Sequence, residues 1–338
     1  MDLPDSSLLG AEGAPADSMR SNAALIGVDW GTTQLRAYRI GSDGQLLERR
    51  HSPLGISSVR EREFSVALDS VLSDWHGESN SRTDSIQIPI LLCGMVGSRQ
   101  GWRETPYTPC PASLDEVITN LVGIDTARGA AWIVGGVSTQ DVRGRYDVMR
   151  GEETQIFGAC ESGERRVIVA PGTHSKWALV HRGTIDNFTT YITGELYAVL
   201  QKHSSLGWKS GPREADRTGV ESREPTFEEK AFLGGVGEVR ANSDLVHALF
   251  SVRTRTLFED LRCGAQAAYL SGILIGNEVL HGLRRYPDLP ITVIANDTLA
   301  PLYRMALAEF GRTDARFIDA EQAVIRGLWQ LWQRRAFP

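Results

Sequence analysis

Residues 25–39 read Leu25-Ile-Gly-Val-Asp-Trp-Gly-Thr-Thr-Gln-Leu-Arg-Ala-Tyr-Arg39, and this stretch decides the fold because its pattern occurs twice. The second copy, at residues 167–180, reads Val167-Ile-Val-Ala-Pro-Gly-Thr-His-Ser-Lys-Trp-Ala-Leu-Val180. Each copy is an apolar strand, a Gly-Thr turn and a second strand. Such turns present backbone N–H and hydroxyl donors to a ligand. Two of them facing each other predict a clamp around a polyphosphate.

The two copies differ in one charge. Asp29 stands in the first strand where the second copy has Ala170. Because Mg²⁺ usually takes one or two protein carboxylates together with phosphate oxygens, Asp29 is the predicted magnesium ligand. The predicted phosphate-binding positions are Gly31, Thr32, Thr33, Gly172, Thr173, His174, Ser175 and Lys176. For His174, capping of the turn is the alternative, and either copy taken alone could be an unrelated hairpin with a glycine turn.

Composition sets the broad class of the protein. A chain of 338 residues suits two domains, and its formal charge of −6 argues against a nucleic-acid partner. No apolar run approaches the roughly 18 residues of a membrane span, so no membrane partner is expected. Residues 1–20 lack the basic start and apolar core of a signal peptide and are expected to be a disordered extension. The four cysteines form no CxxC motif, which indicates reduced thiols and a cytoplasmic location.

Hydrophobic periodicity predicts how the chain is organised. Two three-stranded meanders are expected, the first at residues 25–50 and the second at 167–190. Each is accompanied by helical patterns, and a unit repeated once predicts two similar α/β domains with a cleft between them. The expected domains are residues 21–150 and 151–318, with a final helix in 319–338 that packs back on the first. Helices are predicted at 65–75, 149–160, 194–203, 265–280, 299–309 and 321–334, and further strands at 86–93, 131–134 and 291–295.

Several motifs resemble known ones. Asp29-Trp-Gly-Thr-Thr33 resembles the first phosphate motif of the actin-like ATPase superfamily, which includes sugar kinases, and Pro171-Gly-Thr-His-Ser-Lys176 echoes it. Four more blocks narrow the resemblance: Gly94-Met-Val-Gly-Ser-Arg-Gln-Gly-Trp102, Pro106-Tyr-Thr-Pro-Cys-Pro111, Met149-Arg-Gly-Glu-Glu-Thr-Gln155 and Thr193-Gly-Glu-Leu196. In this order the set is similar to the 2-dehydro-3-deoxygalactonokinase family. The resemblance implies two ribonuclease H-like (actin-like ATPase) domains that flank a nucleotide cleft.

The family resemblance also implies a reaction. It is transfer of the γ-phosphoryl group of ATP, with Mg²⁺, to the 6-hydroxyl of 2-dehydro-3-deoxy-D-galactonate in galactonate catabolism. Such a transfer requires a carboxylate to accept the hydroxyl proton. Glu153, directly before Thr154, resembles the acid of the Asp-Thr pair in hexokinase-type enzymes and is the first expected base, with Glu152 second. The alternative is that both are helix N-terminal charges favoured by the dipole.

The acceptor is a keto acid, so its carboxylate calls for a cation. Arg99 lies in a glycine-flanked loop with Trp102, and a guanidinium fork matches a carboxylate. Arg150 and Lys176 are further cations near the expected cleft. Glu195 could accept hydrogen bonds from substrate hydroxyls or be a charge at a helix end, and Trp102 could instead pack.

The predicted nucleotide-binding set has three further members. Gly234 and Gly235 lie in a glycine-rich run, and Asn296 lies in Ile294-Ala-Asn-Asp-Thr-Leu299, where the superfamily commonly has glycines. Two other functions remain open at this point. One is a kinase for another small sugar acid or sugar, and the other is a non-catalytic nucleotide-binding protein of the actin or Hsp70 type. A homodimer is also left open.

Overall fold

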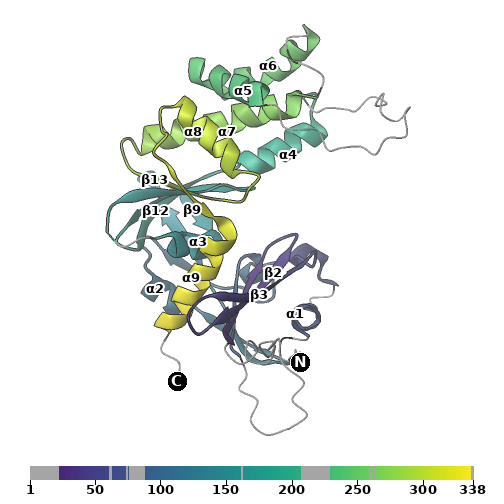
Figure 1. Cartoon of the computed structure of the whole chain (residues 1–338), viewed down its shortest axis with the longest axis vertical. Helices are drawn as coiled ribbons and strands as arrows, with labels where there is room; N and C mark the ends of the chain where they lie inside the picture. The colour runs from purple at the N-terminus through teal and green to yellow at the C-terminus, as the bar shows by residue number, and fades with distance from the viewer. Residues whose placement is uncertain are drawn as a thin grey trace, which may run out of the picture.

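A computed structural model gives the structure of residues 23–60, 63–73, 75, 88–160, 163–206, 229–258, 261 and 264–335. The expected N-terminal extension and nearly all of the polar stretch 209–229 lie outside these described residues. Figure 1 shows helices α4 to α8 gathered at one end of the molecule, with strands β2 and β3 and helix α1 towards the other.

The first meander is part of a six-stranded sheet of order β3-β2-β1-β4-β7-β6. Strands β1, β2 and β3 are antiparallel, whereas β4 and β7 run parallel to β1. The strands are β1 (Ala23–Trp30), β2 (Leu35–Gly41), β3 (Leu46–Ser52), β4 (Ile90–Cys93), β6 (Val122–Thr126) and β7 (Gly129–Ile133). Side chains of β1 alternate between two cores, as the period of two demands. Val28 packs with helix α1 (Phe64–Leu72), and Leu25 packs in the core that contains helix α9 (Ala320–Arg334).

The second meander builds a sheet with the same plan, of order β12-β11-β10-β13-β14. Its three antiparallel strands are again followed by parallel ones. The strands are β10 (Arg166–Ala170), β11 (Ser175–His181), β12 (Thr184–Tyr191), β13 (Ile291–Ala295) and β14 (Arg316–Asp319). The prediction of two similar ribonuclease H-like sheet domains is therefore confirmed.

Helices cover one face of the second sheet. They are α4 (Thr193–His203), α5 (Glu229–Ala241), α6 (Leu245–Leu257), α7 (Gln266–Arg285) and α8 (Ala300–Glu309). Val167 and Val169 of β10 share a buried core with α7 residues such as Ile273 and Val279. The predicted helices at 194–203, 265–280 and 299–309 are confirmed, whereas α5 and α6 were not predicted.

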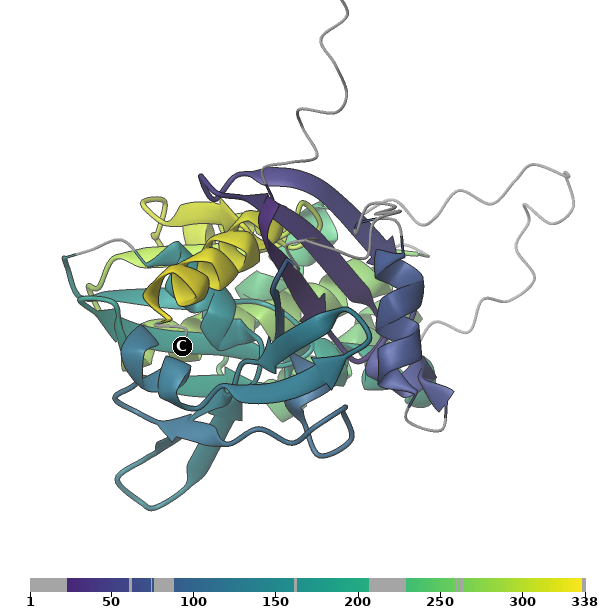
Figure 2. The same ribbon diagram turned by 90° about the horizontal axis from the view of Figure 1, so that it is seen from below.

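Two helices cross between the sheets, α3 (Glu152–Ala159) and α9. Gly158 and Gly327 lie at the crossing, where an added Cβ would overlap the carbonyl oxygens of Ala323 and Thr154 respectively. Glycine is needed here because the two backbones touch. Helix α9 lies against β1, β2 and β4 and also contacts β13 and β14 (Figure 2). The domain limits at 150 and 318 stay a prediction.

A small third sheet lies beside β12. Its order is β5-β8-β9, from β5 (Tyr107–Pro109), β8 (Gly136–Gln140) and β9 (Tyr146–Met149), and helix α2 (Leu114–Thr119) follows β5. Asp147 of β9 accepts hydrogen bonds from the Thr190 backbone and hydroxyl of β12. Strand β5 was not predicted from the sequence, which indicated a loop in the region of Arg99 that precedes it.

The sequence also led to expectations about membrane spans and cysteines. None of the helices among the described residues is both long and apolar enough to cross a membrane. Cys93, Cys110 and Cys160 are free thiols. Cys263 lies outside the described residues.

Candidate active site

The first Gly-Thr turn places Asp29 at the carboxyl end of β1, in register with Cys93 at the end of β4. The turn is closed by a hydrogen bond from the Gly31 N–H to the Gln34 carbonyl, 2.9 Å long. Arg36 of β2 donates to Asp29 Oδ2 at 3.4 Å. Burial raises the pKa of Asp29, and the nearby Arg36 opposes that rise. Asp29 is thus a mostly buried acid with a single weak cationic partner.

The side chains of Thr32 and Thr33 are exposed at the tip of this turn. The Thr32 carbonyl accepts hydrogen bonds from the backbone and the hydroxyl of Ser57. An added Cβ at Gly55 would overlap the Thr33 backbone, so the chain after β3 supports the turn from behind. The predicted donor groups of the first turn are therefore held in place and face solvent.

The second turn brings a buried lysine to the site. Lys176, at the start of β11, is 3% exposed. Its Nζ lies 2.8 Å from Glu152 Oε1 and donates to the His174 carbonyl at 2.7 Å. Because Glu152 opens helix α3, this ion pair joins the second turn to the start of that helix. The Gly172 N–H donates to Ser175 Oγ at 3.3 Å, which ties the turn to its own strand.

Two glycines allow the start of α3 to approach the end of β4. Gly94 and Gly151 have φ of 92° and 108°, and a Cβ added to Gly151 would lie 3.1 Å from Gly94 Cα. At Gly94, an added Cβ would lie 3.3 Å from Asp29 Oδ1. Only glycine adopts such backbone angles easily. Asp29 and the acids of α3 consequently lie close together.

The two acids of α3 have different surroundings. Glu152 has a side chain that is 26% exposed, and its Oε2 accepts from the Arg150 N–H at 3.0 Å. Glu153 is fully buried, with Oε2 accepting from the Gly151 N–H at 2.6 Å and Oε1 from the Thr154 hydroxyl at 3.0 Å. Burial foremost, and then the charge of Glu152, raises the pKa of Glu153 to about 7. Of the two predicted bases, the second choice is the one that faces solvent.

The cations predicted for the acceptor carboxylate also differ. Arg99 has a side chain that is 88% exposed and pairs with Glu104 at 3.3 Å. Arg150 is buried, donates to the carbonyl of Thr105 at 3.0 Å and to its hydroxyl, and lies 4.3 Å from the Tyr107 ring centroid. Arg99 is therefore free to reorient, whereas Arg150 is fixed.

Trp102 anchors the loop that carries Arg99. Its ring is stacked on Phe64 with centroids 6.2 Å apart, and it meets Trp30 edge to face at 6.4 Å. In this structure Trp102 therefore packs against other aromatic rings, which is the alternative to a role in substrate binding. Since Trp30 belongs to β1, the loop is attached to the strand that carries Asp29.

Helix α4 docks on the second turn. His174 and Glu195 form a close ion pair or hydrogen bond, and the Glu195 N–H donates to the Thr173 carbonyl at 3.0 Å. A Cβ added at Gly194 would lie 2.5 Å from the Gly172 carbonyl oxygen. The predicted residues His174 and Glu195 are thus partners of each other where α4 meets the second turn.

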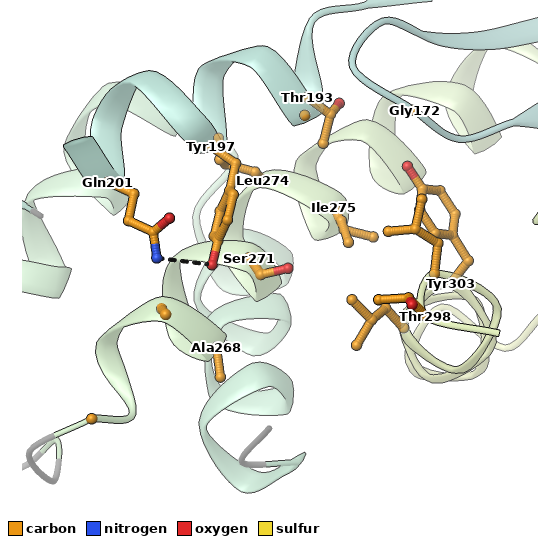
Figure 3. Close-up of a pocket in the computed structure, with 15 residues that line it drawn as sticks. Gly172, Thr193, Tyr197, Gln201, Ala268, Ser271, Leu274, Ile275, Thr298 and Tyr303 are labelled. Atoms are coloured by element: carbon orange, nitrogen blue, oxygen red, sulfur yellow. Dashed lines mark hydrogen bonds between the residues drawn. The ribbon is translucent and has the colours of Figure 1, made fainter. Parts of the chain in front are cut away.

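A cavity of about 330 Å³ opens beside this turn (Figure 3). Its walls come from α4, α7 and α8, and Gly172 of the second turn also lines it. Tyr197 and Gln201 of α4, joined by a 3.4 Å hydrogen bond, form one wall, and Tyr303 of α8 forms the opposite one. Apolar groups such as Ile275 make up most of the lining. A cavity of this size and character suits a small organic ligand.

The remaining residues that were predicted to bind the nucleotide do not line this cavity. Gly234 and Gly235 belong to α5, and a Cβ added at Gly235 would overlap the Tyr269 carbonyl oxygen of α7. This glycine therefore serves close packing of the two helices, and neither residue lines the cavity. Asn296 accepts a hydrogen bond from the Leu299 N–H at 3.0 Å. It lines a second cavity of about 300 Å³ that also contains Asp29.

The prediction did not include Glu278, a buried acid of α7 behind the first cavity. Its carboxylate accepts hydrogen bonds from Trp177, Thr193 and Tyr303. One signal in the sequence pointed to it. An acid among the apolar residues of a long helix requires a specific set of donors, because an unpaired buried charge is costly.

Two sheets of the same plan, each with a Gly-Thr turn, are joined where Lys176 pairs with Glu152, and this plan is that of the actin-like ATPase fold to which sugar kinases belong. The chain belongs to the 2-keto-3-deoxy-galactonokinase family, whose model matches residues 29–331. The match covers every predicted site residue and both sheets apart from the first six residues of β1.

Two curated relatives carry names from this family. A protein named "Probable 2-dehydro-3-deoxygalactonokinase" from Rhizobium meliloti is 34% identical over 305 residues, which is 89% of this chain and 94% of the relative. The 2-dehydro-3-deoxygalactonokinase of Escherichia coli is 32% identical over 293 residues, 86% of this chain and 91% of the relative.

A solved structure shares the fold. It is the crystal structure of a protein provisionally assigned as a 2-dehydro-3-deoxygalactonokinase from Sinorhizobium meliloti, with a TM-score of 0.78 and 32% identity. The alignment covers 91% of this chain and 98% of that one.

Proposed function

We propose that the protein transfers the γ-phosphoryl group of ATP to the 6-hydroxyl of 2-dehydro-3-deoxy-D-galactonate, in the catabolism of galactonate. Membership of the family and the names of two relatives support the substrate. The observation that carries the chemistry is the Lys176–Glu152 ion pair, which joins the second turn to the acids beside Asp29. A phosphoryl donor and an acceptor hydroxyl could meet at this junction.

The nucleoside of ATP is assigned to the cavity between α4, α7 and α8. Its apolar lining suits a base, and its lining includes Gly172 of the second turn. The phosphates would then lie along Gly172, Thr173 and Lys176, with Asp29 beyond them. Lys176 supplies positive charge where negative charge develops on the transferring group. The cavity's position next to a Gly-Thr turn supports this direction for the nucleotide.

The donors at the first turn fit a magnesium ion. Asp29 offers one carboxylate, and Asp297 and Asp319 line the same cavity. Mg²⁺ bound by the phosphates and one or two carboxylates would neutralise charge on the phosphates. No cluster of three or more acids, histidines or cysteines suited to a metal occurs among the described residues. Phosphate oxygens of the nucleotide would supply the remaining ligands.

The geometry favours Glu152 over Glu153 as the base. A base must reach within hydrogen-bond distance of the hydroxyl, and of the two acids only Glu152 is exposed to solvent. The 6-oxygen bonds to phosphorus, the bond to the bridging oxygen of ADP breaks, and the hydroxyl proton passes to the Glu152 carboxylate. Glu153 would then hold the Gly151 backbone at the start of α3, as its 2.6 Å hydrogen bond indicates.

The acceptor is assigned to the side of the cleft that carries the Arg99 loop. Arg99 is free to turn towards a carboxylate, and Arg150 would fix the strand from which α3 begins. Glu195 and His174 would contact acceptor hydroxyls or the phosphates. A cytoplasmic location is proposed with this function, on the support of the free thiols Cys93, Cys110 and Cys160.

The test is phosphorylation of a panel of acceptors by the purified protein. ATP consumption should depend on 2-dehydro-3-deoxy-D-galactonate, and phosphorus NMR should show a phosphomonoester on carbon 6. Its gluco-configured epimer serves as the matched control and should have a lower kcat/KM. Turnover with another sugar acid, but not with 2-dehydro-3-deoxy-D-galactonate, would show that the other acid is the substrate. Nucleotide binding without turnover on any acceptor would favour the non-catalytic alternative.

A further inference from the structure

Glu278 lies at the centre of a buried hydrogen-bond network behind the nucleotide cavity. It is 1% exposed in the middle of α7. Trp177 Nε1 donates to its Oε1 at 2.9 Å, and the Tyr303 hydroxyl lies 2.8 Å from both carboxylate oxygens. The Thr193 hydroxyl donates to Oε2. Three donors from three other elements therefore converge on one carboxylate.

These donors surround the second phosphate turn. Trp177 follows Lys176 in β11, Thr193 is the first residue of α4, and Tyr303 lies in α8. Thr193 and Tyr303 also line the cavity (Figure 3). Glu278 itself does not line the cavity. It can act on a ligand only through the groups that it holds.

Two connections lead from Glu278 to Gly172. In one, the Tyr303 hydroxyl lies 3.2 Å from Ser175 Oγ, which accepts from the Gly172 N–H at 3.3 Å. In the other, Thr193 precedes Gly194, whose Cα packs directly on the Gly172 carbonyl. The turn is thus held from both sides by groups bonded to the same carboxylate.

We propose that Glu278 is a positioning residue for the nucleotide, because it fixes the second turn and the start of α4 at the distance that ATP requires. The proposal rests on the assignment of this cavity and turn to ATP. A carboxylate can serve here because all its neighbours are donors. An amide of the same shape keeps only one acceptor oxygen, so its NH₂ group would force the hydroxyl of Thr193 or Tyr303 to turn and accept where it now donates.

The primary test is Glu278→Gln. We expect the KM for ATP and the Kd for ADP, measured by calorimetry, to rise roughly tenfold, as for loss of a hydrogen bond to a charged group. The KM for the sugar acid should stay within about twofold of wild type. Calorimetry with ADP keeps this test independent of the acceptor, so failure of the proposed reaction and failure of the positioning role are distinguishable.

A matched control is Glu238→Gln on the neighbouring helix α5. Glu238 also accepts from a tyrosine hydroxyl, that of Tyr269, and from Arg255, both at 3.2 Å, but neither of these partners lines the cavity, whereas Thr193 and Tyr303 do. We expect this variant to bind ADP as the wild type does. An equal loss of ADP binding in both variants would indicate general loosening of the helices and would overturn the proposal.

Tyr303→Phe provides a second variant in case Glu278→Gln does not fold. It removes the hydroxyl that links Glu278 to Ser175 and should also raise the Kd for ADP with little change in the KM for the acid. Where both variants fold, the double variant should resemble the weaker-binding single one, because the connection that Tyr303→Phe breaks is one of the two that Glu278→Gln breaks. Effects that multiply, or an unchanged Kd in either single variant, would overturn the positioning role.

Discussion

The two Gly-Thr hairpins share a backbone plan and differ in their charges. In the first, Asp29 pairs across the strands with Arg36, whereas Ala170 and Trp177 occupy the matching positions of the second. The cation of the second hairpin is Lys176, where the first has Leu35. The charged groups of the candidate site are therefore distributed between the two turns. The first carries the acid suited to a metal, and the second carries the cation suited to phosphates.

The hairpins also differ in register by one residue. Ala37 pairs with Val28, but Ala178 pairs with Ile168 and not with the equivalent Val169. Residues 31–34 connect paired strand ends in the first turn, and residues 171–175 do so in the second. The larger second turn accommodates His174 and Ser175. These residues connect it to α4 and to Tyr303, a support that the first turn does not have.

The two hairpins also differ in the residues that pack against them. The first hairpin packs against an aromatic cluster of Trp30, Phe64 and Trp102 that carries the Arg99 loop. The second packs against α7 and α8, which enclose an apolar cavity. We therefore assign the acceptor to the first half and the nucleoside to the second.

The largest expected effect is that of Glu152→Gln, at the junction of the two halves. Loss of a general base lowers the rate by about 10²–10⁴-fold, so kcat should fall by that factor while both substrates still bind. Steady-state kinetics with ADP calorimetry measures both. Glu153→Gln is the matched control and should lose less activity. If Glu153→Gln were the variant that lost kcat, the base would be Glu153, as the sequence first predicted.

A smaller effect, confined to one half, is expected for Arg99→Ala. Loss of a charge-assisted contact costs about 1.5–3 kcal/mol, so the KM for the sugar acid should rise roughly 10- to 150-fold. The KM for ATP should change little, because the nucleotide is assigned to the other half. Arg103→Ala, an exposed arginine of the same loop, is the control and should leave both constants unchanged. Equal weakening of both substrates by Arg99→Ala would contradict the division.

The smallest effect concerns stability and pH. The pKa of Glu153 is raised from 4.5 to about 7, so the folded state holds this proton more tightly than the unfolded state does. The resulting stabilisation is complete below about pH 4.5 and is lost as the pH rises through 7, amounting to at most about 3 kcal/mol. The melting temperature of the wild type should therefore fall more steeply between pH 5 and 8 than that of Glu153→Gln. Parallel curves would show that Glu153 is not the protonated group.

The sequence predicted the local parts of this site well. Both meanders, α3 and α9 were found because alternating apolar residues, glycine turns and helical spacing are local signals. The sequence could not show which of the two acids is the better candidate for the base. Glu152 and Glu153 are adjacent, and only the packing of the chain decides which of them is buried. The network around Glu278 joins residues up to 128 positions apart, which periodicity cannot show.

Glycine was the most ambiguous signal. Gly31 and Gly172 lie in turns, as predicted, whereas Gly235 lies at a helix contact and Gly264 lines the cavity without having been predicted. The reason is physical. A missing side chain permits close approach of a ligand or of another backbone, and sequence alone does not distinguish the two.

The division of charge between the two turns is tested most directly by calorimetric titration of Asp29→Asn with ADP, with and without Mg²⁺. For the wild type, we expect Mg²⁺ to tighten ADP binding. Asp29→Asn should bind metal-free ADP at least as tightly as the wild type, because one negative charge near the phosphates is gone, but Mg²⁺ should no longer tighten binding. Full tightening by Mg²⁺ in Asp29→Asn, or loss of metal-free ADP binding, would contradict the account.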